Sequence, residues 1–293
     1  MKKIQTLLNF FLSEKFKDKS ENVIIYISIF AFIFHLLFIF LNKFNLFNLA
    51  LVSSLFSNPI AAIYTPFSFI LIYEVYLLVY YLPKSTTIYI GKQYEIILLI
   101  IIRRIFKDIS NLELTNNWFD VKYDLIFLYD IVAVVVLFFL IFIFYRLSDL
   151  QKKEVIISEK MERFISIKNG IASLLVPLLL ILSFYSFFNW ILQSFFSVNA
   201  LVYKFEDINK IFFEDFFTVL ILVDVLILLF SFLHSDKFST VIRNSGFIIS
   251  TIMIKLSFNT EGILNDILLV FSVVFGILIL LIHNKYDKLK KNI

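Results

Sequence analysis

The sequence contains no cysteine, and it has only three histidines, five glycines and four prolines in 293 residues. Without cysteine the chain can form no disulfide bond, thiolate metal site or cysteine nucleophile. The three histidines are scattered, which excludes a histidine-rich metal cluster. Many secondary transporters unwind helices at glycine or proline to bind substrate midway across the membrane, so the shortage of both residues argues against that class.

Motifs that would identify a chemistry are also missing. The sequence has no GxxxxGK[ST], GxGxxG, HExxH or GxSxG motif, no histidine and aspartate spaced as in acyltransferases, and no TVGYG-like potassium filter. It has no basic groove with interleaved aromatic residues of the kind that binds nucleic acid. We therefore expect no cofactor, no metal site and no nucleic-acid partner, and a protein that is not an enzyme is favoured over an enzyme.

Apolar residues are abundant instead. They make up 60% of the chain, the mean hydropathy is +0.89, and long apolar runs recur along the whole length. A soluble domain is only about half apolar. The sequence therefore predicts an all-α fold, a polytopic integral membrane helical bundle of about eight transmembrane helices. The expected spans are 23–42, 59–82, 88–106, 123–145, 171–193, 213–233, 241–258 and 263–283.

The third of these spans decides the topology, because Lys92 to Phe106 carries Glu95, Arg103 and Arg104 within its apolar run. If it crosses, nineteen of the 27 basic residues fall on one side together with both termini. Lysine and arginine are enriched on the cytoplasmic side of membrane proteins. We therefore expect a multi-pass protein of the inner (cytoplasmic) membrane with both termini in the cytoplasm.

The pattern also predicts how the chain is organised. Residues 1–146 are expected to form an amphipathic surface helix over 1–20 and a first bundle of four spans, with an interfacial helix at 45–57. Residues 147–170 form a polar helical connection on the inner side, and 171–293 form a second four-span bundle with a basic tail. Two halves of equal orientation suit a parallel repeat, but they share no matching residues, so duplication stays open.

Several ionisable side chains fall inside the expected spans. Counting from each span centre at 1.5 Å per residue places Glu95 and Asp224 near the midplane and Glu74 roughly 5 Å to the inner side. His35 and Asp130 fall to the outer side, and Arg103, Arg104 and Lys255 nearer the outer boundary, where they can snorkel. A charge at the bilayer centre costs roughly 2.5–3.5 kcal/mol on insertion scales, so these residues need a reason to be there.

Two interpretations of these residues remain open. They form an acid-lined route for an ion or proton through Glu74, Glu95, Asp130, Asp224 and His35, or the acids pair with Arg103, Arg104 and Lys255 to make burial tolerable. For Glu95 we expect an arginine partner or a polar cavity. Asp224 has no basic residue within reach on its own helix, so its partner must come from another span, from water or from a proton.

Three function classes follow from these interpretations. An ion or proton channel or transporter is favoured, with a small cation or proton as its partner. A non-catalytic scaffold or assembly subunit is the alternative, and the sequence leaves homo-oligomerisation open. The third is a lipid-modifying membrane enzyme, which would need His234, Ser235, Asp236 and His283 to converge on one site. The lipid bilayer is an expected partner in every case.

Overall fold

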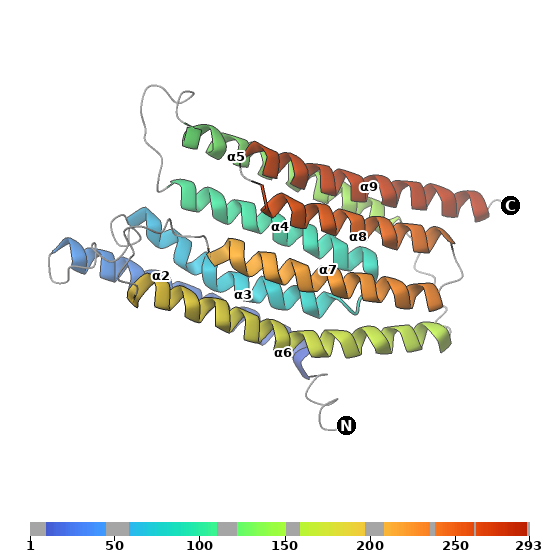
Figure 1. Ribbon diagram of the computed structural model, residues 1–293, viewed down its shortest axis with the longest axis horizontal. Coiled ribbons are helices and arrows are strands. Elements are labelled where there is room, and N and C mark those ends of the chain that lie inside the picture. The colour runs from blue at the N-terminus through green and yellow to red at the C-terminus, as the bar shows by residue number, and fades with distance from the viewer. Residues whose placement is uncertain are drawn as a thin grey trace. The chain divides into compact units, whose positions relative to one another are not determined.

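The computed structural model describes residues 10–44, 59–109, 122–150, 159–196, 208–234, 238–260 and 262–291, and within these ranges the chain is helical without a single strand (Figure 1). The helices are α2 (Glu14–Lys43), the 3₁₀ helix η3 (Pro59–Ile63), α3 (Tyr64–Tyr81), α4 (Thr86–Ile109), α5 (Lys122–Asp149), α6 (Glu159–Phe196), α7 (Ile208–His234), α8 (Phe238–Phe258) and α9 (Ile263–Lys291). The all-α expectation is confirmed.

Five segments of the described helices are long and apolar enough to cross a membrane: Glu14–Lys43, Leu125–Asp149, Phe216–Leu233, Phe238–Phe258 and Ile263–Leu289. Several apolar helices of this kind are what the sequence predicted for an integral membrane protein. The helix α4 is not among the five, because Lys92, Glu95, Arg103 and Arg104 interrupt its apolar run.

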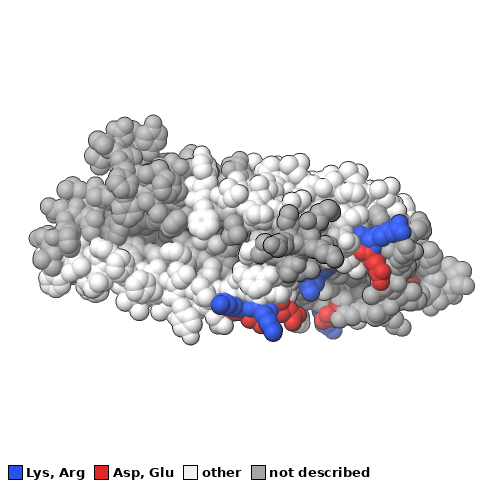
Figure 2. Space-filling model, turned by 90° about the horizontal axis from the view of Figure 1, so that it is seen from below, with Lys and Arg blue, Asp and Glu red and all other residues white. Residues whose placement is uncertain are grey.

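Large apolar side chains lie on the surface of these helices. Phe30 on α2 is 69% exposed and Phe138 on α5 is 68% exposed. The face shown in Figure 2 is correspondingly white over most of its described surface, with few coloured charges. Apolar exposure on this scale is unfavourable in water and is what helices in contact with lipid require.

The first apolar helix begins earlier than the sequence suggested. The side chain of Ser13 caps α2 by accepting a hydrogen bond of 3.2 Å from the backbone N–H of Phe16, and Glu14 adds a favourable charge in the first turn. Residues 14–20 are therefore the first turns of α2 and not part of a separate surface helix. The rest of that expected helix before residue 10, and the interfacial helix at 45–57, lie outside the described residues.

The contacts divide the chain into two compact units with interleaved segments. Unit 1 comprises Met1–Tyr80, Arg103–Phe127 and Ser173–Phe213. Unit 2 comprises Tyr81–Ile102, Leu128–Ala172 and Glu214–Ile293. Each unit thus takes segments from before and after the polar connection at 147–170.

In unit 1, tyrosines of α3 hold the beginning of α2. The Tyr73 hydroxyl donates to the Glu21 carboxylate, and the Tyr76 hydroxyl donates to the carbonyl oxygen of Phe11, both at 2.7 Å. The Lys17 ammonium lies 5.9 Å from the ring centroid of Tyr80. The three tyrosines recur on one face of α3 and therefore bind the same neighbouring segment.

In unit 2, α8 and α9 pack side by side along their length (Figure 1). Glycine allows the close approach: a Cβ at Gly246 would lie 2.8 Å from Ile279. The core around them is aromatic, with the rings of Tyr94 and Phe144 5.1 Å apart and those of Phe144 and Phe247 5.9 Å apart. These fully or nearly fully buried rings fix where the polar side chains of α4 and α8 meet.

Candidate functional site

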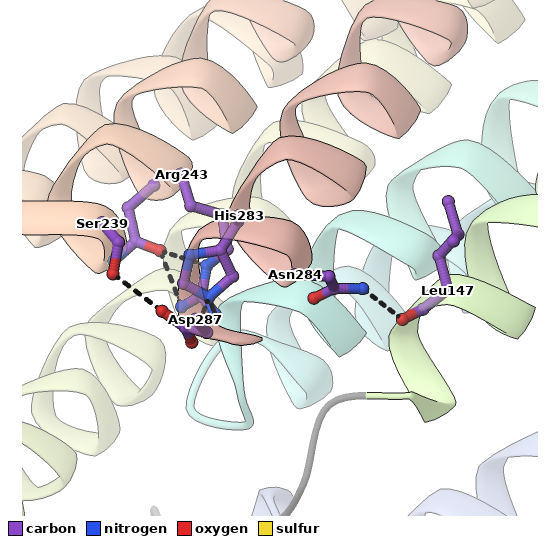
Figure 3. Close-up of polar contacts among 7 residues, drawn as sticks. Leu147, Ser239, Arg243, His283, Asn284 and Asp287 are labelled. Atoms are coloured by element: carbon purple, nitrogen blue, oxygen red, sulfur yellow. Dashed lines mark hydrogen bonds and ion pairs between the residues drawn. The ribbon is translucent and has the colours of Figure 1, made fainter. Parts of the chain in front are cut away.

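The helices of unit 2 have two ends of different character. We call the end where α4 and α8 begin and α5 and α7 finish the polar end, and the opposite end the aromatic end. Contacts between helix ends define the polar end: the Asn284 side chain of α9 donates to the carbonyl oxygen of Leu147 on α5 at 2.8 Å, as Figure 3 shows. At the aromatic end, the rings of Phe217 on α7 and Phe258 on α8 stack 5.2 Å apart.

A small cavity of about 20 Å³ extends inward from the polar end, and a cavity of that size holds about one water molecule. Its polar lining consists of Thr86, Tyr89, Lys168, Asp224 and Asn244, and its apolar lining consists of Leu82, Ile90, Ile227, Leu228, Phe247 and Ile248. Four of the five polar residues are at most 7% exposed. Side chains from α4, α6, α7 and α8 therefore converge on one buried polar space.

Asp224 is the acidic side chain of this cavity and is 5% exposed. The amide nitrogen of Gln93 donates to its Oδ2 at 3.3 Å. The buried hydroxyl of Tyr89 lies beside Asp224 and Gln93, but it forms no well-aligned hydrogen bond with a residue that the structure describes. An unsatisfied buried hydroxyl at a water-sized cavity indicates a site suited to water.

The orientation of the Gln93 amide is set from its other side. The Thr251 hydroxyl of α8 lies 2.8 Å from Gln93 Oε1, to which it donates, and 3.2 Å from the carbonyl oxygen of Phe247, a second acceptor. The Gln93 side chain is completely buried. Its nitrogen is thus directed at Asp224 and its oxygen at Thr251.

The adjacent residue on each helix, Tyr94 on α4 and Ser250 on α8, forms a second polar contact. The hydroxyls of Tyr94 and Ser250 lie 2.7 Å apart, and the Ser250 hydroxyl also donates to the carbonyl oxygen of Ser272 on α9 at 2.8 Å. A Cβ at Gly276 would lie 1.9 Å from the Tyr94 hydroxyl oxygen, so only glycine leaves room for this ring. These contacts tie α4, α8 and α9 together beside the cavity.

Lys168 provides the positive charge of the cavity. It lies in α6 before the apolar run that begins at residue 171, it is 4% exposed, and its ammonium donates to the carbonyl oxygen of Lys84 at 2.6 Å. Burial lowers the pKa of Lys168 to about 8; Asp224 opposes this shift and Arg243 adds to it. The cavity therefore places a cationic group and a carboxyl on the same wall.

Beyond the cavity, a cluster of polar side chains on α8 and α9 lies at the polar end (Figure 3). The Arg243 guanidinium donates to Asn244 Oδ1 from Nε at 3.3 Å and from Nη2 at 3.1 Å. His283 Nε2 lies 3.2 Å from Arg243 Nη1 and 3.4 Å from Asp287 Oδ2. Ser239 donates to Asp287 Oδ1 at 3.0 Å, and the Asp287 side chain is 49% exposed. The cluster leads from an exposed carboxylate to Asn244 on the cavity wall.

The aromatic end has a different lining. Phe216 and Phe217 are fully buried, as are Ile254 and Leu269 to within 1% exposure. Polar groups are buried toward this end as well: Asn265 donates to the carbonyl oxygen of Ser257 at 2.6 Å, and the carboxyls of Asp130 and Asp266 are buried. Among the described residues, apolar side chains therefore predominate at this end without excluding polar groups.

The structure places the residues predicted from sequence in different units. His35, Glu74, Arg103 and Arg104 belong to unit 1, and Glu95, Asp130, Asp224 and Lys255 belong to unit 2. In unit 1, His35 Nδ1 is hydrogen-bonded to the Thr65 hydroxyl, and the buried Glu74 lies close enough to Arg103 for an electrostatic interaction.

The predicted residues of unit 2 also have separate surroundings. Glu95 accepts hydrogen bonds from Lys92 and from the Tyr145 hydroxyl, both at 2.6 Å, so its partners are a lysine and a tyrosine. Asp130 is completely buried on α5, and Lys255 is half-buried in the last turn of α8. Of these residues, Asp224 lines the cavity.

The enzyme interpretation required four residues to converge. His283 is engaged by Arg243 and Asp287, as described above. Ser235, Asp236 and the side chain of His234 lie outside the described part of the chain.

Sequence reasoning missed Tyr89, Gln93, Lys168, Asn244 and Thr251. A signal for two of them was present in α8, where the buried positions include Asn244, Ser250, Thr251 and Ser257. Positions seven apart lie on one helix face, so Asn244 and Thr251 form a buried polar stripe on α8. This stripe on α8, together with Asp224 on α7, is the sequence signal that could have located the cavity.

The arrangement can bind and release a proton at Asp224 and can hold one water molecule beside it. No protein-family model, curated protein or solved structure matches this chain.

Proposed function

We propose that the chain is an eight-span protein of the inner membrane that moves protons or small cations, with Asp224 as the residue that carries the charge. In this proposal α2 to α9 cross the membrane in turn, both termini lie inside, and the polar end of unit 2 faces the cytoplasm. The partition of basic residues described above supports this orientation.

One observation carries the proposal: Asp224 is buried in an apolar helix at the wall of a water-sized cavity. A buried carboxyl without a direct ion pair is costly, and such residues in membrane proteins mark ion and proton routes. The unsatisfied Tyr89 hydroxyl adds a second reason for water in the same place.

The two ends of unit 2 suggest the sequence of events. The polar cluster from Asp287 to Asn244 provides access from the cytoplasm, and the packed phenylalanines close the opposite side in this conformation. Alternating access requires a closed side in each state, so we assign the structure to an inward-facing state.

The direct test is flux through purified protein in liposomes. An imposed potential or ion gradient should drive ion uptake in the wild type, followed with a pH-sensitive dye and with radioactive sodium and rubidium. Asp224→Asn should reduce the flux by about 100-fold or more, because the amide can bind no proton and has no charge. The variant keeps the size and most hydrogen bonds of the side chain, so it should fold and insert as the wild type does.

A matched control uses an acid outside the cavity. Glu95→Gln should retain flux, because Glu95 is held by Lys92 and Tyr145 away from the cavity lining. Loss of flux in Glu95→Gln with normal flux in Asp224→Asn would move the site to Glu95.

The topology has its own test. The chain has no native cysteine, so single cysteines can be placed without background. Cysteine replacing Ser148 or Asn292 should react with an impermeant reagent only from the cytoplasm, and cysteine replacing Asn117 or Asn259 only from outside. Labelling of the Ser148 position from outside would refute the eight-span topology.

A non-catalytic scaffold is the second candidate, and internal pairing favours it. Glu95 has two partners, and Glu74 lies near Arg103. If the wild type moves no ion under any gradient, and Asp224→Asn lowers thermal stability instead, the scaffold replaces the transporter.

A further inference from the structure

We infer that the ion handled at Asp224 is the proton, and that Gln93 and Thr251 form a reversible hydrogen-bond relay that satisfies Asp224 in both of its protonation states. The inference rests on the proposed function, because it names the ion and adds two positioning residues to the same site.

The donors around Asp224 disfavour a metal cation. Sodium, magnesium and calcium ions require several oxygen ligands around them. Asp224 is the one acid among the described residues of the cavity lining, Gln93 directs its amide nitrogen toward it, and the Lys168 ammonium shares the cavity. The neutral oxygens in the lining are those of Thr86, Tyr89 and Asn244, and Asn244 Oδ1 already accepts from Arg243. A metal ion would thus meet one carboxylate and few free oxygens beside a positive charge, whereas a proton needs only one oxygen atom.

In the ionised state the relay runs from α8 to α7. The Thr251 hydroxyl donates to Gln93 Oε1 at 2.8 Å, and Gln93 Nε2 donates to Asp224 Oδ2 at 3.3 Å. Each donor faces an acceptor, and the carboxylate receives a hydrogen bond that compensates part of its burial.

A proton reaching Asp224 from the cavity reverses this order. A hydronium ion in the cavity gives its proton to Asp224 Oδ2 and becomes a water molecule. The protonated Oδ2 now carries a hydrogen to donate, and it is a weaker acceptor for the Gln93 N–H group than the carboxylate oxygen was. If the amide turns over, Asp224 O–H donates to Gln93 Oε1 and Gln93 Nε2 donates to Thr251 Oγ1. Thr251 keeps a partner for its own hydrogen, because the Phe247 carbonyl oxygen lies 3.2 Å away.

The second acceptor is the decisive feature. A threonine with a single acceptor would lose its hydrogen bond when the amide turned, and a buried unsatisfied donor costs about 1–3 kcal/mol. The two distances at Thr251 let the network exchange partners without leaving any of its groups unsatisfied. Among the described residues, the charged or titratable groups that act on Asp224 are Tyr89 and Lys168, and Arg243 in turn acts electrostatically on Lys168.

The test combines proton flux in liposomes with infrared spectroscopy of the same purified protein. Thr251→Val preserves the shape of the side chain but removes the hydroxyl, and it should reduce proton flux about tenfold, the size expected for one unsatisfied buried polar group. Thr251→Ser should restore most of it. Ser245→Ala is the control, because the Ser245 hydroxyl donates to the Val241 carbonyl oxygen of its own helix and, among the described residues, to no group of the relay.

Infrared difference spectra between high and low pH provide a readout that does not need transport. At low pH the carboxylic acid band of Asp224 should appear together with a shift of the Gln93 amide band. The first band is assigned by its loss in Asp224→Asn, and the second by its loss in Gln93→Leu. Thr251→Val should remove the amide shift.

The outcomes separate the relay from the transport function. Sodium or rubidium uptake without proton flux would overturn the inference and leave cation transport intact. Unchanged proton flux and an unchanged amide shift in Thr251→Val would overturn the relay alone. Absence of any flux would end the proposed function, and the infrared bands would then decide the relay by themselves.

Discussion

The polar and aromatic ends of unit 2 are built from the same helices and differ in what those helices direct inward. At the polar end, α4, α6, α7 and α8 surround Asp224 and a water-sized cavity. At the aromatic end, Phe217 stacks on Phe258 and apolar side chains occupy most of the buried positions. Among the described residues, the water-sized cavity therefore lies toward one end of the unit and the stacked phenylalanine rings lie toward the other.

The largest effect is expected at the aromatic end. Phe217→Ala should destabilise the protein by about 3–5 kcal/mol, because it deletes a fully buried ring and leaves a cavity. If the phenylalanines close the route, the variant should also leak protons through liposomes without a driving substrate. Thermal unfolding and dye-reported leak measure the two effects.

The matched control for this change is Phe138→Ala on α5. That ring is 68% exposed, so its removal should change the stability by no more than a few tenths of a kcal/mol. It should also leave the proton leak unchanged. A Phe217→Ala protein as tight as the wild type would show that the aromatic end is ordinary packing, and the difference between the ends would lose its functional meaning.

The next effect concerns Gly276, which lies against the buried ring of Tyr94. Gly276→Ala should cost about 1–3 kcal/mol, because the new Cβ would lie 1.9 Å from the Tyr94 hydroxyl oxygen and force the ring away from Ser250. Thermal unfolding should show the loss, and Tyr94→Phe in the Gly276→Ala background should recover part of it.

Gly170 provides the comparison for this glycine. A Cβ there would meet nothing within 4 Å, and alanine in a helix is favoured over glycine by about 1 kcal/mol. Gly170→Ala should therefore be neutral or stabilising. Equal destabilisation at Gly170 and Gly276 would show that the contact with Tyr94 does not explain the requirement for glycine.

The sequence predicted the fold better than the site. Long apolar runs identify helices by themselves, and the midplane position of Asp224 with no basic residue on its own helix made it a candidate. The partners of Asp224 come from α4, α6 and α8, far away in the chain, so spacing along one helix contains no information about them. Gln93 and Lys168 could be found only from the packing.

Residue Glu95 shows the opposite case. Its depth in the expected span marked it as strongly as Asp224, but Lys92 one turn earlier and Tyr145 from α5 satisfy its carboxylate. A lysine at i−3 is a local signal that was present in the sequence. Depth in a span therefore shows that a charge needs partners, and the packing shows whether those partners leave any capacity for function.

The last expected effect is a pH dependence of stability at the polar end. Burial lowers the pKa of Lys168 from 10.5 in an unfolded chain to about 8 in the folded protein. Between these two values the unfolded chain binds a proton that the folded protein does not, so stability rises with pH across this window and levels off at its edges. Below pH 8 both forms are charged, and the difference no longer changes.

Lys168→Met removes this titration and also removes the hydrogen bond to Lys84. The lost bond shifts stability by the same amount at every pH, whereas the lost titration changes the slope. Between about pH 8 and about pH 10.5, the difference in Tm between wild type and variant should therefore change with pH. Below about pH 8 this difference should stay constant. A constant difference across the whole range would mean that Lys168 is not desolvated beside Asp224, and the cavity would then be open to bulk water at the polar end.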